Sequence, residues 1–168
     1  MKLTHEKECL SAFARLPSGV VIVTAFDEVR KPFGATIGSF SSLSMDPPMA
    51  VFAMFQTSAT LEAIRQTGRF AVHFVEYPNR SAAMHFASRS ADKFNDDLEW
   101  EESQEGLPML SGFNTCLSCR LVELRPAGDH DLVICAVEGV DLSDIQCEPT
   151  AWFMSSFHEL QRPISLSH

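Results

Sequence analysis

The sequence predicts a mainly β fold, a closed or nearly closed antiparallel barrel with α-helices at its periphery. Segments with strand character outnumber helical segments, and hairpin connections dominate among them. The two central helical segments each lie between strands, and no G-x-G-x-x-G motif follows a strand, which disfavours a doubly wound parallel sheet. A chain of 168 residues is also close to the usual size of one domain, so residues 1–168 are expected to share one core.

The first elements are expected to be a short helix and a β-hairpin. Apolar residues recur at helical spacing in residues 9–16, and Pro17 ends that pattern because proline disfavours helix in the residue before it. The β-branched run 18–26 predicts the first strand. Polar residues 27–32 are typical of a hairpin connection, so the second strand is expected from Phe33 onward.

A helix between two strands is expected next. Pro47 and Pro48 cannot sit inside a ladder and therefore mark a turn, after which the apolar run 49–55 suits a strand buried on both faces. Residues 57–68 open with hydroxyl side chains that can cap a helix and close with glycine, as a helix often does. Residues 69–75 then predict another strand.

The second half of the chain predicts one more helix and three strands. Residues 78–90 have helical spacing after a proline, and the polar residues 91–108 predict a long surface excursion. Two strands are expected around the turn at Gly128 and Asp129, and residues 151–157 predict a last strand.

Composition and charge narrow the possible partners. Apolar residues make up 45% of the chain, which is ample for a packed core. The formal net charge of -9 repels phosphate backbones, and the 13 Lys and Arg form no basic run, so nucleic acid is not an expected partner. The N-terminal residues lack the apolar stretch of a signal peptide and no apolar run is long enough to span a bilayer. The sequence therefore predicts a cytoplasmic protein with no membrane partner.

The cysteines do not predict a metal site. Five cysteines include a single C-x-x-C at Cys116 and Cys119, without a second pair or a His motif at metal spacing. A strand would place these two side chains on opposite faces, so packed, reduced thiols are expected. His73 and His85 lie on apolar elements and are expected to be core histidines.

Small hydroxyl residues crowd the stretch that begins at Gly34. Along the second strand the face with Thr36, Gly38, Phe40 and Ser42 alternates with the face that carries Ala35, Ile37, Ser39 and Ser41, so neither face forms a continuous apolar stripe. One explanation is an edge strand that faces water. The other is a phosphate cradle, because hydroxyls and backbone N–H groups can converge on a phosphate near a helix N-terminus, which Ser58 and Thr60 would supply.

Several blocks resemble one family in order and spacing. They are LPSGVVIVTA, GATIGSFSSLSMDPPM, SATLEAIRQTGRFAV, FASRSADKF, EGLPML and GDHDLVICAVEGV. Together they resemble the flavin reductase family, the small FMN- or FAD-binding NAD(P)H:flavin oxidoreductases that often serve as reductase components of two-component monooxygenases. The resemblance extends from about Leu16 to Leu160, and several blocks in register make it a specific signal.

The resemblance implies a split β-barrel of Greek-key type, a homodimer with flavin near the dimer interface, and hydride transfer from NADH or NADPH to FMN or FAD. The reduced flavin would be supplied to a partner monooxygenase. The residues that match the family's cofactor-binding blocks are Thr36, Ser39, Phe40, Ser41, Ser42, Phe55, Gln56, Ser58, Thr60, Ser88, Lys93 and Phe94.

His130 matches the family histidine near the nicotinamide site, which implies a catalytic role in orienting the carboxamide or protonating reduced flavin. An exposed histidine of a hairpin turn is the alternative. For Lys93 and Phe94 the alternative is a solvated lysine beside a core phenylalanine. No residue is expected to bind a metal.

The chain also departs from the family pattern. Phe55 stands where Asn is usual, Ala59 where Arg is common, and His73 where Asn is common, and the C-terminal block lacks its basic residues. These departures motivate a second hypothesis, a flavin-binding electron carrier or sensor without efficient NAD(P)H oxidation. A barrel oxidase of the pyridoxamine phosphate oxidase type is a third, which would require more basic residues than this chain has.

Overall fold

The computed structural model describes residues 2–88, 92–95, 98–143, 148 and 150–161. Its elements are α1 (Lys2–Phe13), β1 (Val21–Phe26), β2 (Pro32–Ile37), β3 (Ser41–Met45), β4 (Pro48–Phe55), α2 (Ala59–Thr67), β5 (Arg69–Phe74), α3 (Arg80–Ala87), β6 (Trp100–Glu102), β7 (Pro108–Leu110), β8 (Thr115–Ala127), β9 (His130–Leu142), β10 (Thr150–Phe153) and β11 (Ser156–Glu159).

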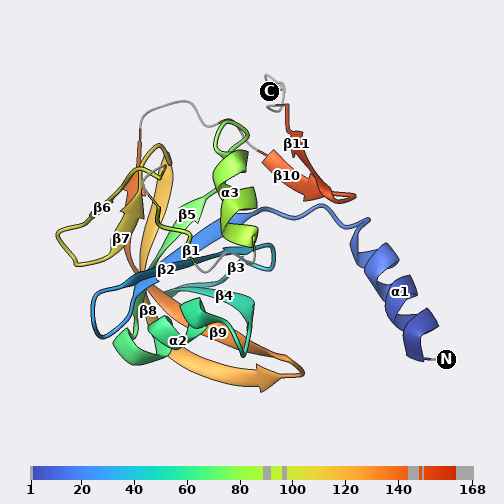
Figure 1. Cartoon of the computed structure of the whole chain (residues 1–168), viewed down its shortest axis with the longest axis horizontal. Coiled ribbons are helices and arrows are strands. Elements are labelled where there is room, and N and C mark those ends of the chain that lie inside the picture. Colours follow the sequence, from blue (N-terminus) through green and yellow to red (C-terminus); the bar gives the residue numbers. More distant parts are fainter. Residues whose placement is uncertain (1, 89–91, 96–97, 144–147, 149, 162–168) are drawn as a thin grey trace.

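Seven strands form one antiparallel sheet in the order β2-β1-β5-β8-β9-β4-β3 (Figure 1). The predicted mainly β fold is confirmed. Of the expected closed or nearly closed barrel, the closed form is not found, because β2 and β3 are the two edges of the sheet and no ladder joins them in the described part of the chain. Only residues 38–40 connect these edges.

Strand β1 is buried along its whole length because the two faces of the sheet both carry a core. Val21 and Val23 point to one apolar cluster, together with Phe52 of β4 and Ile64 of α2. The alternate residue Ile22 points to a second cluster under α3. The period-2 alternation of a strand thus lets one segment join both cores.

The second strand is shorter than predicted. It ends at Ile37, and β3 is a separate edge strand that pairs with β4. The hydroxyl of Ser39 explains the gap between β2 and β3. It accepts a hydrogen bond from the backbone N of Ala53 in β4 at 2.9 Å, where a backbone carbonyl of a neighbouring strand would otherwise accept. Strand β4 alternates between buried and half-buried residues and is exposed at its two ends, so the expectation that it is buried on both faces is also corrected.

Both central helices are confirmed. Ser58 caps α2, and its Oγ accepts from the backbone N of Leu61 at 3.4 Å, while Gly68 closes the helix at φ 70°. None of the helices in the described part of the chain is both long and apolar enough to cross a membrane.

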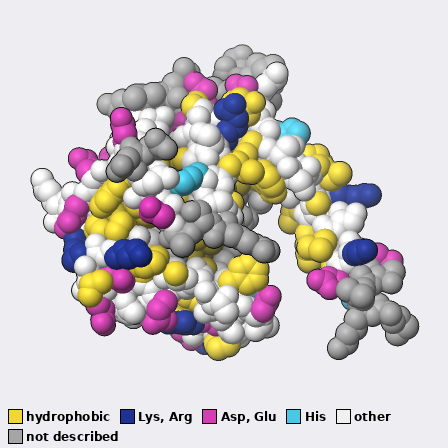
Figure 2. Space-filling model, in the orientation of Figure 1, with side chains coloured by type: hydrophobic (Ala, Val, Ile, Leu, Met, Phe, Trp, Pro, Cys, Tyr) yellow, Lys and Arg dark blue, Asp and Glu magenta, His cyan; other side chains and the backbone are white. Residues whose placement is uncertain are grey.

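Helix α1 extends over Lys2–Phe13, further towards the N-terminus than predicted, and stands away from the sheet (Figures 1 and 2). The expected surface excursion includes β6 and the first residue of β7, which pair as a small hairpin, and its residues 91, 96 and 97 lie outside the described residues. The expected last strand is a hairpin, β10–β11, because Met154 and Ser155 adopt positive φ values of 49° and 62° and reverse the chain. Positive φ at both central residues is the geometry of a two-residue hairpin turn, and two residues without a glycine give no sequence signal for it.

Candidate functional site

One cavity of about 890 Å³ opens between β2, the start of α2 and the end of α3. Its wall carries apolar and hydroxyl side chains, together with two lysines and one aspartate. The lining residues are Lys31, Pro32, Phe33, Gly34, Ala35, Thr36, Phe55, Thr57, Ser58, Ala59, Thr60, Phe86, Ala87, Ser88, Asp92, Lys93 and Phe94. The structure therefore brings together seven of the residues expected in a cofactor site, namely Thr36, Phe55, Ser58, Thr60, Ser88, Lys93 and Phe94.

The N-terminus of α2 forms one end of this cavity. Helices leave their first N–H groups without intrahelical partners, and the helix dipole makes that end positive. The hydroxyl of Thr60 is unusual, because this residue is only 3% exposed, lines the cavity and has no hydrogen-bond partner for its side chain among the described residues. The Thr60 oxygen is not among the fully buried side-chain atoms without a partner, so it is open to the cavity and can bond a group held there. This end of the cavity is therefore suited to an anionic group that accepts hydrogen bonds, as a flavin phosphate does.

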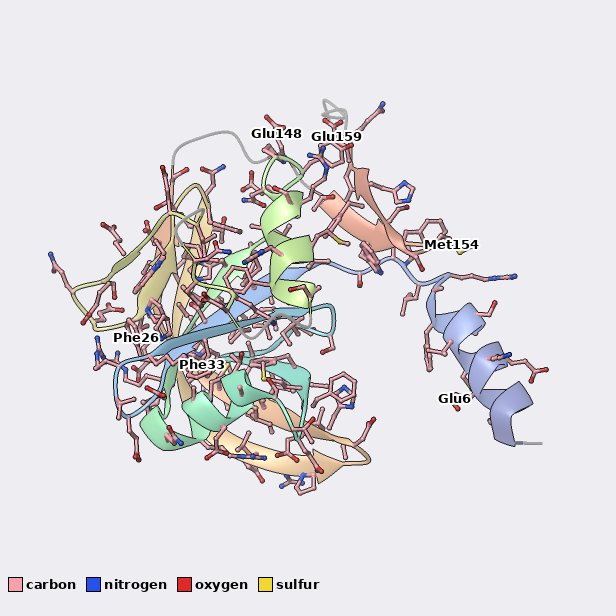
Figure 3. All side chains as sticks on the ribbon, in the orientation of Figure 1. Glu6, Phe26, Phe33, Glu148, Met154 and Glu159 are labelled. Atoms are coloured by element: carbon pink, nitrogen blue, oxygen red, sulfur yellow. The ribbon has the colours of Figure 1, made fainter. Side chains whose placement is uncertain are left out.

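The opposite wall depends on Gly34 in β2. A Cβ atom at this position would lie 2.4 Å from the ring of Phe86, so only glycine lets α3 pack this closely against the strand. Thr36 ties the same helix down, since its Oγ1 donates to the backbone O of Ala83 at 2.6 Å. Phe33 lies on β2 (Figure 3) and adds a further apolar surface to the cavity.

Lys93 holds the third side of the cavity in place. Its Nζ donates to the backbone O of Gly34 at 3.2 Å and to that of Phe86 at 2.7 Å. Burial lowers the pKa of this ammonium group below its usual value. Lys93 therefore links β2 to the C-terminal end of α3, where a cation also interacts favourably with the helix dipole.

His130 does not line the cavity but lies directly behind a residue that does. Its ring lies on the ring of Phe55, with centroids 3.9 Å apart and planes 34° apart. The Nδ1 atom is 2.7 Å from Oδ1 of Asp129, and this hydrogen bond lowers the pKa of the Asp129 carboxyl. The Nε2 atom has no hydrogen-bond partner in the described residues, so it is available to another group.

A hydrogen-bond network around the buried Asp131 fixes the segment that carries His130. Gln56 donates from Nε2 to Oδ1 of Asp131 at 2.9 Å and to the backbone O of His130 at 3.3 Å. The Asp131 side chain is 5% exposed and forms an ion pair with Arg65 of α2. The network joins the end of β4, the start of β9 and α2 into one rigid unit, in which Gln56 acts through its neighbours and not from the cavity wall.

The remaining predicted residues lie away from the cavity. The ring of Phe40 packs in the core against Phe52 and Phe74, at centroid distances of 6.0 and 5.8 Å. Ser39 bonds the backbone of β4, as described above, while Ser41 and Ser42 are exposed on the edge strand β3.

Sequence reasoning misses several lining residues, including Lys31, Gly34 and Phe86. Lys31 belongs to a polar hairpin connection and Phe86 to the apolar pattern of a helix, and neither pattern distinguishes a cavity wall from an ordinary surface or core. Gly34 carries a signal, because a glycine inside a strand often marks a close approach of another element.

Comparisons with known proteins agree with this geometry. The family model described as flavin reductase like domain matches residues 13–161. A relative from Streptomyces coelicolor named actinorhodin polyketide dimerase is 36% identical over 133 residues, which cover 79% of this chain and 75% of that protein. NADH:riboflavin 5'-phosphate oxidoreductase from Streptomyces pristinaespiralis is 32% identical over 149 residues, covering 88% of this chain and 84% of the relative.

Among solved structures, a nitrilotriacetate monooxygenase component B homolog from Mycobacterium thermoresistibile superposes with a TM-score of 0.89. The match has 25% sequence identity and covers 96% of this chain and 89% of that one. The family match spans almost all of the described residues, including every wall of the cavity. The chain belongs to the flavin reductase family.

Proposed function

We propose that the protein is an NAD(P)H-dependent flavin reductase that transfers hydride from a nicotinamide nucleotide to FMN or FAD and supplies reduced flavin to a partner monooxygenase. The observation that carries this proposal is a cavity of about 890 Å³ with the N-terminus of α2 at one end, where the hydroxyl of Thr60 has no partner among the described residues. The relative named as an NADH:riboflavin 5'-phosphate oxidoreductase and the structural neighbour named as a monooxygenase component support it.

The residues of the cavity would mainly bind and orient. The first N–H groups of α2, with the hydroxyl of Thr60, would hold the flavin phosphate. Phe33, Phe86 and Phe94 would exclude water beside the ring system. Flavin, when bound, supplies a ring that accepts hydride from a stacked nicotinamide, so positioning by these residues accounts for most of the acceleration.

His130 is proposed to handle a proton. Its Nδ1 faces the Asp129 carboxylate, so Nδ1 carries the hydrogen and Nε2 is left to accept or donate. The ring of Phe55 supports the imidazole from the side of the cavity. A protonated Nε2 would donate to reduced flavin or to the nicotinamide carboxamide.

Thr60→Val tests the proposed phosphate contact. Valine keeps the shape of the side chain and removes the unpartnered hydroxyl, so we expect unchanged or higher stability together with flavin binding weakened by roughly 5- to 10-fold. Thr67→Val is the matched control on the same helix, because its Oγ1 bonds Ala63 O at 3.0 Å. Flavin affinity that is equal in wild type and Thr60→Val would remove Thr60 from the site.

The activity itself is tested by anaerobic addition of NADH and then NADPH to flavin-loaded protein, with the flavin absorption band followed. Rapid bleaching supports the reductase and identifies the donor. A band that bleaches only with dithionite supports the electron carrier instead. That alternative has one structural observation in its favour, since Lys93, one of only two lysines on the described cavity wall, donates to backbone carbonyls.

The protein is also proposed to be a cytoplasmic homodimer with a split β-barrel. The two edge strands β2 and β3 are joined by only three residues, so one end of each lies near the other, which supports a nearly closed, split barrel. Helix α1 supports the dimer, because Leu10 and Phe13 are 63% and 72% exposed and an isolated helix of 12 residues is marginal in water. Sedimentation of wild type and Phe13→Asp tests this proposal. We expect a dimer that Phe13→Asp weakens, whereas a wild-type monomer at all concentrations would contradict it.

A further inference from the structure

Phe55 is exposed to an unusual degree for a large aromatic residue on a cavity wall. The residue is 56% exposed although it lines the cavity. The ring of His130 covers one side of it, at a centroid distance of 3.9 Å. The remaining apolar surface faces water, and covering it with an apolar or aromatic group of a ligand is favourable. Phe55 therefore presents a supported aromatic surface to whatever enters this end of the cavity.

A tight turn sets the position of Phe55 relative to the start of α2. The backbone N of Ser58 donates to the backbone O of Phe55 at 2.9 Å, so the aromatic ring and the helix N-terminus are one turn apart. The backbone N of Gln56 also donates to Asp129 O at 3.1 Å, which holds the turn against the β8–β9 hairpin. An anion site and an aromatic surface fixed side by side match the two ends of a nucleotide, its phosphate and its base.

We propose that the open surface of Phe55 stacks on a purine base, the adenine of a dinucleotide whose phosphates lie at the N-terminus of α2. The inference rests on the proposed function and extends it to ligand choice. FAD and the nicotinamide dinucleotides contain adenine, whereas FMN does not. The ligand chemistry is the same in both cases, an adenylate group against an aromatic ring.

The negative charge of the protein makes base stacking important for nucleotide affinity. The chain has a formal net charge of -9, which opposes the binding of anionic nucleotides. On the described cavity wall only Lys31 and Lys93 are cationic, and Lys93 donates to two backbone carbonyls. Stacking of a neutral base on Phe55 adds affinity that does not depend on these cations.

The test compares dissociation constants for FAD and FMN, measured by flavin fluorescence on wild type, Phe55→Ala and Phe55→Trp. Base stacking on an aromatic side chain predicts that Phe55→Ala weakens FAD binding by roughly 5- to 100-fold and weakens FMN binding much less. Phe55→Trp keeps an aromatic surface and should retain the FAD preference. Leu142→Ala is the matched control, since Leu142 is 66% exposed on β9, outside the cavity.

A second measurement distinguishes the two sources of adenine. The KM for NADH is compared with that for dihydronicotinamide mononucleotide, which lacks adenine, in wild type and Phe55→Ala. A loss confined to FAD assigns the base to the flavin dinucleotide, and a loss confined to NADH assigns it to the hydride donor. Either result supports the inference. Equal losses for ligands with and without adenine, or no loss for any of them, would overturn it.

Titration with 5′-AMP separates this inference from the proposed function. We expect wild type to bind 5′-AMP more tightly than Phe55→Ala, whatever the flavin does. Wild type that binds no flavin would reject the reductase proposal alone, while equal 5′-AMP affinities in wild type and Phe55→Ala would reject the stacking.

Discussion

At the scale of single residues, Thr24, His73 and Cys116 form a buried chain of hydrogen bonds with one direction. Thr24 Oγ1 donates to the backbone O of Pro108 at 2.6 Å, so it accepts from His73 Nε2 at 3.0 Å. His73 Nδ1 is then left to accept from the thiol of Cys116 at 3.3 Å. All three hydrogen bonds can form together only when the imidazole is neutral. Burial favours this neutral form and lowers the pKa of His73 to about 4.

This histidine makes stability depend on pH. The unfolded chain binds a proton below the ordinary histidine pKa of 6.5, whereas the folded chain resists protonation down to a pKa of about 4. The contribution of His73 to the free energy of unfolding is therefore complete above pH 6.5. It is lost as the pH falls from 6.5 towards 4, by at most about 1.4 kcal/mol per pH unit. Between pH 7 and 5, urea denaturation should show wild type losing about 2 kcal/mol more than His73→Asn, which cannot titrate. Parallel losses in the two proteins would mean that His73 is protonated when folded.

Gly34 links packing to the shape of the cavity. Gly34→Ala would place a Cβ atom 2.4 Å from the Phe86 ring and force α3 outward. We expect a loss of about 1–3 kcal/mol in the free energy of unfolding, together with weaker flavin binding. Gly19→Ala is the matched control, because a Cβ atom there meets nothing within 4 Å. Chemical denaturation of both variants checks the expectation, and equal stabilities would show that Phe86 moves without cost.

At the scale of elements, the hairpins β8–β9 and β10–β11 differ in the residues that adopt positive φ values in their turns. Gly128 occupies φ 69° in the turn between β8 and β9, where glycine has no steric penalty. Met154 and Ser155 hold positive φ values between β10 and β11 without that advantage. The second hairpin is therefore strained at its turn.

Changing these turns should move stability in opposite directions. Replacing Met154 and Ser155 by Asn and Gly suits a turn with two positive φ values and should stabilise β10–β11 by about 1 kcal/mol. Gly128→Ala should destabilise β8–β9 by a similar amount. Hydrogen exchange of each hairpin measures both effects. Slower exchange in β8–β9 of Gly128→Ala would contradict the assignment of its turn.

The elements also show how far sequence can lead. The caps of α2 at Ser58 and Gly68 and the turn at Gly128 are predictable, because those residue types have local preferences. The end of β2 at Ile37 is not, because it depends on the hydroxyl of Ser39 reaching the backbone of Ala53, which is 14 residues away. In the same way, Thr60 can be predicted as part of a helix N-terminus, but its lack of a partner can only be seen in the folded chain.

At the scale of the whole molecule, the negative charge should oppose nucleotide binding over long distances. The formal charge of -9 acts over a Debye length of about 30 Å at 10 mM salt and only about 8 Å at 150 mM. We expect kcat/KM for NADH to rise by roughly twofold or more between these conditions. Dihydronicotinamide riboside, which has no phosphate, should show no such rise. A fall of kcat/KM for NADH with added salt would mean that the lysines on the cavity wall dominate.

The separation of α1 from the sheet makes protease cleavage a measure of assembly. Arg15 follows α1 in an exposed turn, and trypsin cuts after arginine where the backbone can open locally. In a free subunit this bond is accessible from the start. If a second copy covers α1, the rate at which α1 is released should fall as protein concentration rises, so digestion at several concentrations reports the subunit affinity without any labelling.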